Sequence, residues 1–375
     1  VCAPGWGQRA YLNTLPTDAW YDTSIYNTYA ENDNKGSWDH DDWRLGLDYD
    51  LSDNTLIYTY LATGFKSGGI GDVFRETDPY TGEEINVRTS FGPEEVMTWE
   101  IGAKTTLLDG RLKLQATYFY SDYDDMQYAS VGSIATTHRW EAQRDENDQP
   151  IYDEDGNPVF DWNTVPIIAY YTQNVPGAEI QGIEIEIDWL PYENGRIWGY
   201  VSWLDTEITD DWITKWNYDP VSYLNLSFDE SLDSEDDVLQ VNLKGNEMAV
   251  SPPWKLHLTI DHAFFLPQQR TTIVPWLTAH WEDASYLTIF NVDKHLDDMN
   301  FVILDEDIRY TDDRREAWSM FHAGVRVYHG RFMAEAFCYN MTDEVVQWWG
   351  GAAEQVAKGS FSMPTTYGVR FGYKF

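Results

Sequence analysis

Apolar and polar side chains alternate residue by residue in the C-terminal segment 365–375. Because successive side chains of a β-strand point to opposite faces, this pattern predicts a strand with one apolar face and one face of cations and glycines. Such a strand suits a membrane barrel, which has lipid outside and water inside and leaves no backbone N–H or C=O unpaired in hydrocarbon. The apolar set is Tyr367, Val369, Phe371, Tyr373 and Phe375, and the other set is Gly368, Arg370, Gly372 and Lys374.

The same alternation recurs upstream, in segments 111–120, 182–189 and 254–264. In 182–189 it sets isoleucines against acids, with Ile183, Ile185, Ile187 and Trp189 opposite Gly182, Glu184, Glu186 and Asp188. We expect roughly eleven or twelve strands from about Trp43 onward. A soluble β-sandwich also alternates, with its polar face outward, and is the alternative. Aromatic residues near strand ends favour the barrel, since they suit the membrane interfaces: Tyr58, Tyr60, Trp99, Tyr118, Tyr120, Trp189, Trp198, Trp203 and Trp254.

The links between these segments are short and long in turn. Short periplasmic turns and long extracellular loops are typical of outer-membrane barrels, and a compact soluble domain has few structureless loops of such length. The short links are rich in Gly, Pro, Asn and Asp: Leu51 to Asn54, Leu107 to Gly110, Pro191 to Gly195, Pro267 to Arg270, and His329 with Gly330. The long links are about Ser67 to Glu94, Val131 to Val165, Thr209 to Ser251, Glu282 to Glu316, and Asp343 to Pro364.

Composition narrows the class of protein. The 375 residues are 16% aromatic, and no run approaches the roughly 18 apolar residues of a membrane-spanning helix, which excludes a helical membrane protein. The formal charge of −38 argues against nucleic acid as a partner. It leaves solubility, a salty habitat and attraction of cations open. Cys2 and Cys338 match no metal or redox spacing, and whether they pair is open. No secretory leader opens the chain, so either one has been removed or the chain starts within a longer protein.

Several motifs, in order, resemble the C-terminal part of the barrel of TonB-dependent outer-membrane receptors. The resemblance implies an all-β fold: a transmembrane antiparallel β-barrel portion holding about half of a roughly 22-stranded barrel. It also implies a location in the outer membrane of a Gram-negative cell. The motifs are Tyr58 to Gly69, Pro93 to Glu95 leading into Trp99 to Lys104, Asp109 to Leu112, Ala178 to Glu184, Tyr339 to Glu344, and Tyr367 to Phe375.

The resemblance also implies a domain organisation and partners. Residues 42–375 would be the barrel region, and residues 1–41 an N-terminal region of strand or loop that the pattern does not assign. The plug domain that fills such barrels, with its segment for the TonB energy-transducing complex, has no counterpart here. We therefore expect a second chain or a missing N-terminal half to complete the barrel; the alternative is a self-contained barrel of about twelve strands. Other expected partners are outer-membrane lipid, lipopolysaccharide, and the barrel assembly machinery, for which Phe375 is the signal; nucleic acid is not expected.

Active uptake is the function that this resemblance implies, with an iron–siderophore complex as the ligand. The alternatives are uptake of glycans or other organic nutrients, which 18 tryptophans would suit, or a soluble or surface β-protein that binds glycans without transport. We expect no enzyme, because the sequence has no GxSxG, HExxH, P-loop or dinucleotide motif.

Two groups of loop aromatics are the candidate ligand contacts. Trp348 and Trp349 precede a Gly-Gly pair, and adjacent tryptophans can stack on a flat ligand or a sugar ring. Trp281, Tyr286 and Phe290 form the second group. Packing of these loops against the barrel wall is the alternative.

The acidic loops are the candidate cation sites. Asp153, Asp155 and Asn157 have the oxygen density and the glycine of a calcium loop, although the closing Glu of an EF-hand is missing. A solvated acidic loop is the alternative, and no other cofactor is expected.

Overall fold

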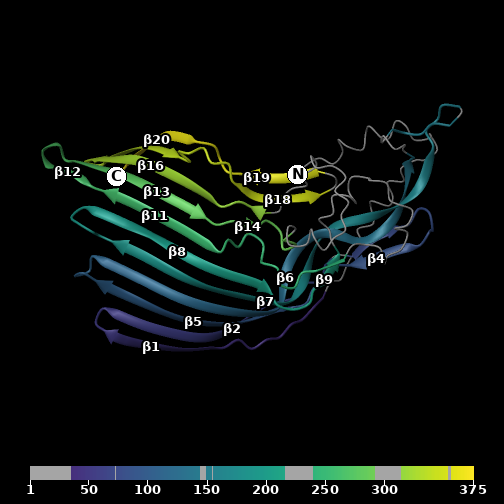
Figure 1. The fold of residues 1–375 in the computed structure, drawn as a ribbon, viewed down its shortest axis with the longest axis horizontal. Coiled ribbons are helices and arrows are strands. Elements are labelled where there is room, and N and C mark those ends of the chain that lie inside the picture. The colour runs from purple at the N-terminus through teal and green to yellow at the C-terminus, as the bar shows by residue number, and fades with distance from the viewer. Residues whose placement is uncertain are drawn as a thin grey trace. The chain divides into compact units, whose positions relative to one another are not determined.

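The computed structural model describes residues 35–375 except for 72, 144–148, 154, 216–239, 292–313 and 354–355. From residue 36 onward they belong to one compact unit, Gly36–Phe375. Its main feature is one antiparallel sheet of twelve strands in the order β1-β2-β5-β6-β7-β8-β11-β13-β16-β17-β20, with β12 paired to β13 (Figure 1). Along this path the strands lie side by side in the order in which they occur in the chain, so the sheet is a meander.

The bounds of the main strands agree with the expected start near Trp43. They are β1 (Arg44–Ser52), β2 (Thr55–Lys66), β5 (Glu94–Leu107), β6 (Leu112–Ala142), β7 (Phe160–Trp189), β8 (Gly195–Ile208), β11 (Trp254–His262), β12 (Phe264–Leu266), β13 (Thr271–Glu282), β16 (Trp318–His329), β17 (Phe332–Tyr339) and β20 (Thr366–Tyr373). The 3₁₀ turn Pro267–Gln269 links β12 to β13. No helix within the described ranges has the length and apolar character needed to cross a membrane.

The long links carry two-stranded hairpins of their own. They are β3 (Val73–Thr77) with β4 (Glu84–Arg88), β9 (Ile213–Lys215) with β10 (Gln240–Asn242), β14 (Ser285–Tyr286) with β15 (Arg314–Arg315), and β18 (Gln347–Ala353) with β19 (Val356–Phe361). The prediction of a loop over Val131 to Val165 is wrong: β6 and β7 stay paired as far as Ala142 and Phe160, and run beyond the rest of the sheet in Figure 1. Val, Ile, Thr and aromatic residues are frequent in these arms and favour extended backbone.

Strand register places the predicted apolar and polar sets on opposite faces of the main sheet. On one face Lys113 pairs with Asp188, and Asp188 with Trp198; we call this the polar face. On the other, Ile185 lies between Ala116 and Val201; we call this the apolar face. Its side chains are exposed over the whole width of the sheet, with Leu45 at 71% and Phe371 at 78%. Exposed apolar area on this scale is unfavourable in water and is suited to lipid.

Three of the predicted interfacial aromatics lie instead on the polar face. The Tyr60 hydroxyl donates a hydrogen bond to Glu100 Oε2 at 2.7 Å, and the Tyr58 hydroxyl lies 3.1 Å from Thr117 Oγ1. Trp198 pairs in register with Asp188. In β2 both alternating sets contain large apolar or aromatic residues, so the sequence there does not identify the lipid side.

The main sheet is open within the described residues. No pairing joins β1 to β20 in this part of the chain, so both remain edge strands. In a closed barrel both edges must have partners, because an unpaired edge in hydrocarbon leaves its N–H and C=O groups without hydrogen bonds. The strand count of the complete barrel, and the boundary at residues 41 and 42, stay predictions.

A buried carboxylate ties the last four strands of the sheet path together. Glu335 on β17 is 3% exposed. Its Oε1 accepts hydrogen bonds from Trp276 Nε1 on β13 at 3.1 Å and from Arg326 Nε on β16 at 2.8 Å, and its Oε2 accepts one from Arg370 Nη1 on β20 at 2.7 Å. A buried charge is stable only when paired and hydrogen-bonded, so this network fixes the side-chain arrangement across four strands.

Replacing Glu335 should therefore weaken the end of the sheet. We expect Glu335→Gln to lower the free energy of unfolding by about 2 kcal/mol, because two guanidinium groups lose their counter-charge. Asp188→Asn is the matched control, since its pair with Arg196 is solvent-exposed and is worth less than about 1 kcal/mol. Urea unfolding of the receptor in lipid vesicles measures both. Equal midpoints for the two variants would contradict this assignment.

Candidate ligand-binding face

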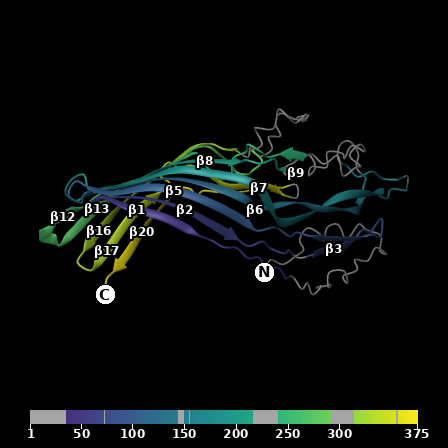
Figure 2. The same cartoon turned by 90° about the horizontal axis from the view of Figure 1, so that it is seen from below.

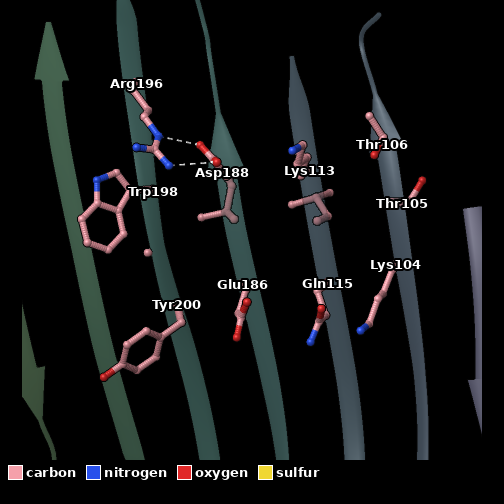
Figure 3. Close-up of a pocket in the computed structure, with 13 residues that line it drawn as sticks. Lys104, Thr105, Thr106, Lys113, Gln115, Glu186, Asp188, Arg196, Trp198 and Tyr200 are labelled. Atoms are coloured by element: carbon pink, nitrogen blue, oxygen red, sulfur yellow. Dashed lines mark hydrogen bonds and ion pairs between the residues drawn. The ribbon is translucent and has the colours of Figure 1, made fainter. Parts of the chain in front are cut away.

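The polar face holds a hollow of about 520 Å³ across β5, β6, β7 and β8 (Figure 3). Its charges are mixed. Arg196 binds Asp188 through two hydrogen bonds, Nε to Oδ1 at 2.8 Å and Nη2 to Oδ2 at 3.0 Å. The labelled side chains that line it are Lys104, Thr105, Thr106, Lys113, Gln115, Glu186, Asp188, Arg196, Trp198 and Tyr200. Leu114, Ile187 and Gly199 complete the lining, so the hollow has both polar and apolar parts.

A second hollow of about 350 Å³ adjoins the first and shares Arg196 and Trp198 with it. Imidazole, indole and hydroxyl groups dominate its lining. The other residues are His257, Thr259, Asp261, Trp276, Thr278, His322, Arg326 and Tyr339. Asn340 N–H donates to His322 Nδ1 at 3.0 Å, so a neutral His322 carries its proton on Nε2 and can act as a donor.

Aromatic rings continue across the polar face from strand to strand. His257 on β11 lies between Tyr200 on β8, with ring centroids 5.7 Å apart, and His280 on β13, at 5.8 Å. His280 stacks on Trp318 of β16 at 4.9 Å, and Trp318 meets Trp348 of β18 edge to face at 5.3 Å. We call Tyr200, His257, His280, Trp318 and Trp348 the ring series. It connects the wall of the sheet to the hairpin after β17.

Two buried donors beside the ring series have no acceptor. Arg315 is fixed by Nη2, which donates to Glu282 Oε2 at 2.9 Å and to Ser285 Oγ at 3.1 Å. Within the described structure its Nε, and the Nε1 of Trp318, have no hydrogen-bond partner. Unsatisfied buried donors are costly, so this pair favours a hydrogen-bond acceptor beside Trp318.

The structure separates the two predicted groups of ligand aromatics. Trp348 is exposed and lies in the ring series. Trp349 lies beside it in β18, where its backbone pairs with Ser360. Trp281 is on the apolar face, while Tyr286 and Phe290 are buried at 6%. The second group therefore forms no common surface, and ligand binding by either group stays a prediction.

Sequence reasoning missed the histidines and Trp318, because its candidate ligand contacts were two groups of loop aromatics. A signal was present: in strand period, His257 shares a face with Lys255, and His280 with Glu282. The register of β11 places His257 and His262 on opposite faces of the sheet. What the sequence lacks is the pairing of β11 with β13, which brings His257 opposite His280.

The predicted calcium loop is a tight turn. Asp153 Oδ1 accepts hydrogen bonds from the N–H groups of Asp155 at 3.0 Å and Asn157 at 2.8 Å, and these bonds lower the pKa of the Asp153 carboxyl. In the described part of the chain, no three His, Cys, Asp or Glu side chains converge to hold a metal ion. Calcium binding by Asp153, Asp155 and Asn157 stays a prediction.

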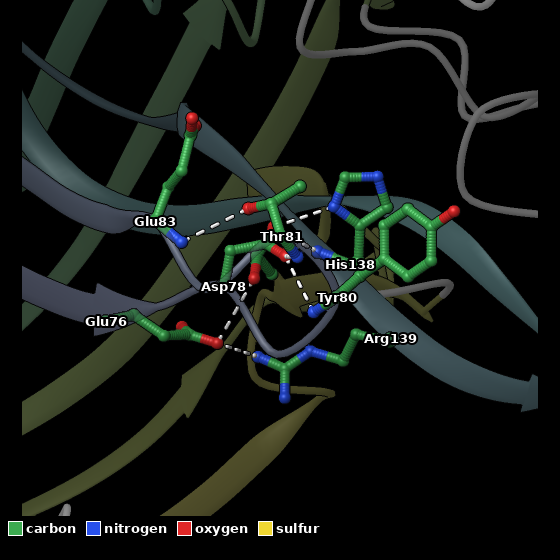
Figure 4. Close-up of polar contacts among 8 residues, drawn as sticks. Glu76, Asp78, Tyr80, Thr81, Glu83, His138 and Arg139 are labelled. Atoms are coloured by element: carbon green, nitrogen blue, oxygen red, sulfur yellow. Dashed lines mark hydrogen bonds and ion pairs between the residues drawn. The ribbon is translucent and has the colours of Figure 1, made fainter.

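The β3–β4 hairpin docks on the extended part of β6 through Asp78 (Figure 4). Asp78 Oδ1 accepts from the N–H groups of Tyr80 and Thr81, and its Oδ2 lies 2.7 Å from His138 Nδ1 and accepts from His138 N–H. Burial alone would raise the pKa of this carboxyl, but the hydrogen bonds from Thr81, His138 and Tyr80 outweigh it and hold the pKa well below its usual value. Arg139 and Glu76 add a weaker pair at 3.5 Å.

A cluster of exposed aromatics lies near the same dock. Trp140 and Trp162 are cross-strand neighbours with ring centroids 5.1 Å apart, and Tyr80 packs on Trp162 at 5.5 Å. At 3.3 Å per residue, Trp140 is roughly 50 Å along β6 from Asp125. The β6–β7 hairpin thus carries aromatic rings far beyond the end of the main sheet.

Known proteins match most of the chain. Residues 17–333 match the family described as TonB dependent receptor-like, beta-barrel. A curated relative, the catecholate siderophore receptor Fiu of Escherichia coli (strain UTI89 / UPEC), is 36% identical over 97 residues, which are 24% of this chain and 12% of that protein. The ferric yersiniabactin uptake receptor FyuA of Yersinia pestis has a TM-score of 0.53 at 16% identity, covering 88% of this chain and 36% of its own. The siderophore receptor PiuA of Acinetobacter baumannii has a TM-score of 0.51 at 16% identity, and the match covers 88% of this chain and 35% of the PiuA chain.

The sheet is a meander with one apolar face and one polar face, and its links are short at one end and long at the other. These features define the wall of an outer-membrane β-barrel. Given the family match, the chain belongs to the TonB-dependent receptors, as a C-terminal portion of their barrel in the outer membrane of Gram-negative bacteria. It spans about a third of the solved receptors that it resembles. The polar face is then the inner wall, and the expectation of a membrane barrel rather than a soluble sandwich is confirmed.

The dock at Asp78 should depend on pH. Its folded pKa is depressed, so its stabilising contribution is complete above the usual value of 3.8 and is lost as the pH falls below it. We expect the backbone amides of residues 73–88 to lose hydrogen-exchange protection progressively as the pH falls from about 4 toward the depressed pKa of Asp78. Asp78→Asn keeps the acceptor for the turn but removes the charge, so this acid-dependent step should disappear. The same step in Asp78→Asn would assign it to another carboxylate.

Proposed function

We propose that the receptor containing this chain takes up an iron–siderophore complex across the outer membrane. The observation that carries the proposal is the ring series, which leads from the exposed Trp348 to His257 on the inner wall, with two unpaired donors beside Trp318. Flat aromatic groups stack on such rings, and donors in a dry site bind anionic oxygens strongly. Ferric siderophores with catecholate groups combine both features. The name of the relative Fiu, a catecholate siderophore receptor, supports this ligand class.

Energy and assembly are further parts of the proposal. A plug supplied from outside this chain would fill the space that the inner wall encloses and would contact the TonB complex. Further strands would pair with the edge strands β1 and β20. Phe375, which is fully exposed beside Tyr373, would be read by the barrel assembly machinery. Lipopolysaccharide would surround the outer end of the apolar face, and loop cations such as calcium would bridge to it.

Uptake of a glycan is the second candidate. The exposed cluster of Tyr80, Trp140 and Trp162 favours it, because sugar rings stack on indole faces. This cluster lies near the far end of β6, away from the ring series on the main sheet. A strain that lacks the receptor distinguishes the candidates: it should fail to grow on chelated iron under the siderophore proposal, and fail on oligosaccharides under the glycan proposal.

Variants in the ring series should impair iron uptake. Loss of one aromatic contact weakens ligand binding by about three- to tenfold, so we expect Trp318→Ala and Trp348→Ala to lower the uptake of a radiolabelled ferric catecholate by that factor. Trp281→Ala is the matched control, because Trp281 lies on the apolar face. Uptake is measured at equal amounts of folded receptor. Normal uptake by both ring-series variants, or an equal defect in the control, would contradict the proposal.

A further inference from the structure

Two buried nitrogen donors lie close together beside the ring series. Arg315 Nε and Trp318 Nε1 have no hydrogen-bond partner in the described structure, and both residues are 6% exposed. The guanidinium carbon of Arg315 lies 6.0 Å from the centre of the Trp318 ring. We propose that these donors form an oxyanion subsite that binds an anionic oxygen of the ligand. The subsite makes the receptor prefer anionic metal complexes to neutral ones, a preference that rests on the siderophore uptake proposed above.

The oxyanion subsite lies at the end of the sheet that carries the long links. Figure 2 shows that β12, β13, β16, β17 and β20 end together at the short-turn side. Glu282, at the last position of β13, pairs in register with Trp318, at the first position of β16, so both lie at the opposite end. Long links are extracellular in outer-membrane barrels. The subsite is therefore on the side from which a ligand arrives.

Two hydrogen bonds hold the Arg315 side chain in place and leave its Nε available. Nη2 donates to Glu282 Oε2 at 2.9 Å and to Ser285 Oγ at 3.1 Å. Because the guanidinium group is planar, these bonds also fix the direction of the Nε–H bond. An acceptor oxygen thus meets a donor that is already oriented, which lowers the entropy cost of binding.

The charges around the oxyanion subsite favour an anion over a neutral acceptor. Lys255 of β11 pairs in register with Glu282, and Arg315 forms an ion pair with the same carboxylate. A neutral His280, which donates from Nε2 to Glu282 Oε1 at 3.1 Å, leaves this count unchanged. Two cations beside one carboxylate carry a surplus positive charge, and an anionic oxygen would match it.

Apolar and aromatic side chains surround the Trp318 donor. Trp318 belongs to a buried cluster with Met320 and Val346. His280 stacks on its ring at 4.9 Å, and Trp348 meets it edge to face at 5.3 Å. In such surroundings the dielectric is low, and a hydrogen bond from an N–H to an anion is strong. Because Trp348 is exposed, the surface of the ring series lies one ring away from the subsite.

Binding of two metal complexes to the complete receptor tests the oxyanion subsite. The probes are anionic gallium(III) tris(catecholate) and neutral gallium(III) tris(hydroxamate). Trp318→Phe keeps an aromatic ring but removes the Nε1 donor, and Arg315→Lys keeps the charge but removes Nε. Loss of one hydrogen bond to a charged group weakens binding by about tenfold. We expect each variant to bind the anionic complex weaker by that factor and the neutral complex unchanged.

The matched controls are Trp281→Phe and Arg111→Lys, which should bind both complexes like the wild type. Trp281 lies on the apolar face, and Arg111 lies in the turn before β6, where its Nε donates to Leu108 C=O. All variants are compared at equal amounts of folded receptor, read from the mobility in unheated gels. Equal binding of the anionic complex by the wild type and both subsite variants would overturn the oxyanion subsite and leave siderophore uptake standing.

The indole proton of Trp318 reports on the hydrogen bond itself. In receptor labelled with ¹⁵N at the tryptophan indoles, the nuclear magnetic resonance signal that Trp318→Phe lacks belongs to Trp318. We expect this proton signal to move downfield when the diamagnetic anionic complex binds, and to stay in place with the neutral one. A signal at a hydrogen-bonded position in the free receptor, unchanged on binding, would assign the donor to a bound water only and overturn the subsite. Binding of neither complex by the wild type would contradict the siderophore proposal as well.

Discussion

Backbone hydrogen bonding in a medium without water is the constraint on which this structure depends. An unpaired N–H or C=O in hydrocarbon costs several kcal/mol, so every strand must find two neighbours. The meander from β1 to β20 satisfies this for all interior strands, and the side-chain period of two then sorts residues to two faces. One chain of alternating residues thus produces both a surface for lipid and a wall for a hydrated interior. Within the described residues the two edge strands β1 and β20 have only one neighbour each.

The same alternation of side chains between two faces brings the binding groups of the polar face together. Because strands pair in register, His257, His280 and Trp318 come from three segments of the chain and meet on one surface. The network around Glu335 holds the neighbouring strands at the positions that this surface requires. Binding residues on loops that a regular scaffold positions are common in proteins, and here the sheet carries hairpins in its long links.

Alternation in the sequence predicts the strands, the short turns and the two faces, since these follow from local pattern. It does not predict the length of the β6–β7 hairpin, because turn-like residues and strand formers are mixed over 131–165. It also misplaces Tyr58, Tyr60 and Trp198, which have polar partners that only pairing reveals. Trp348 is predicted from its position next to a Gly-Gly pair, and its role in binding stays a prediction. Trp318 and the histidines required knowledge of which strands are neighbours.

Side-chain accessibility at two adjacent positions tests the central claim most directly. Nitroxide labels are placed in turn at Ile185→Cys and Glu186→Cys, in a receptor whose Cys2 and Cys338 are replaced by serine and which is embedded in lipid vesicles. The account predicts that the label at 185 collides with lipid-soluble oxygen and hardly with a water-soluble nickel chelate, and that the label at 186 does the reverse. Two labels with the same accessibility to both reagents would contradict it.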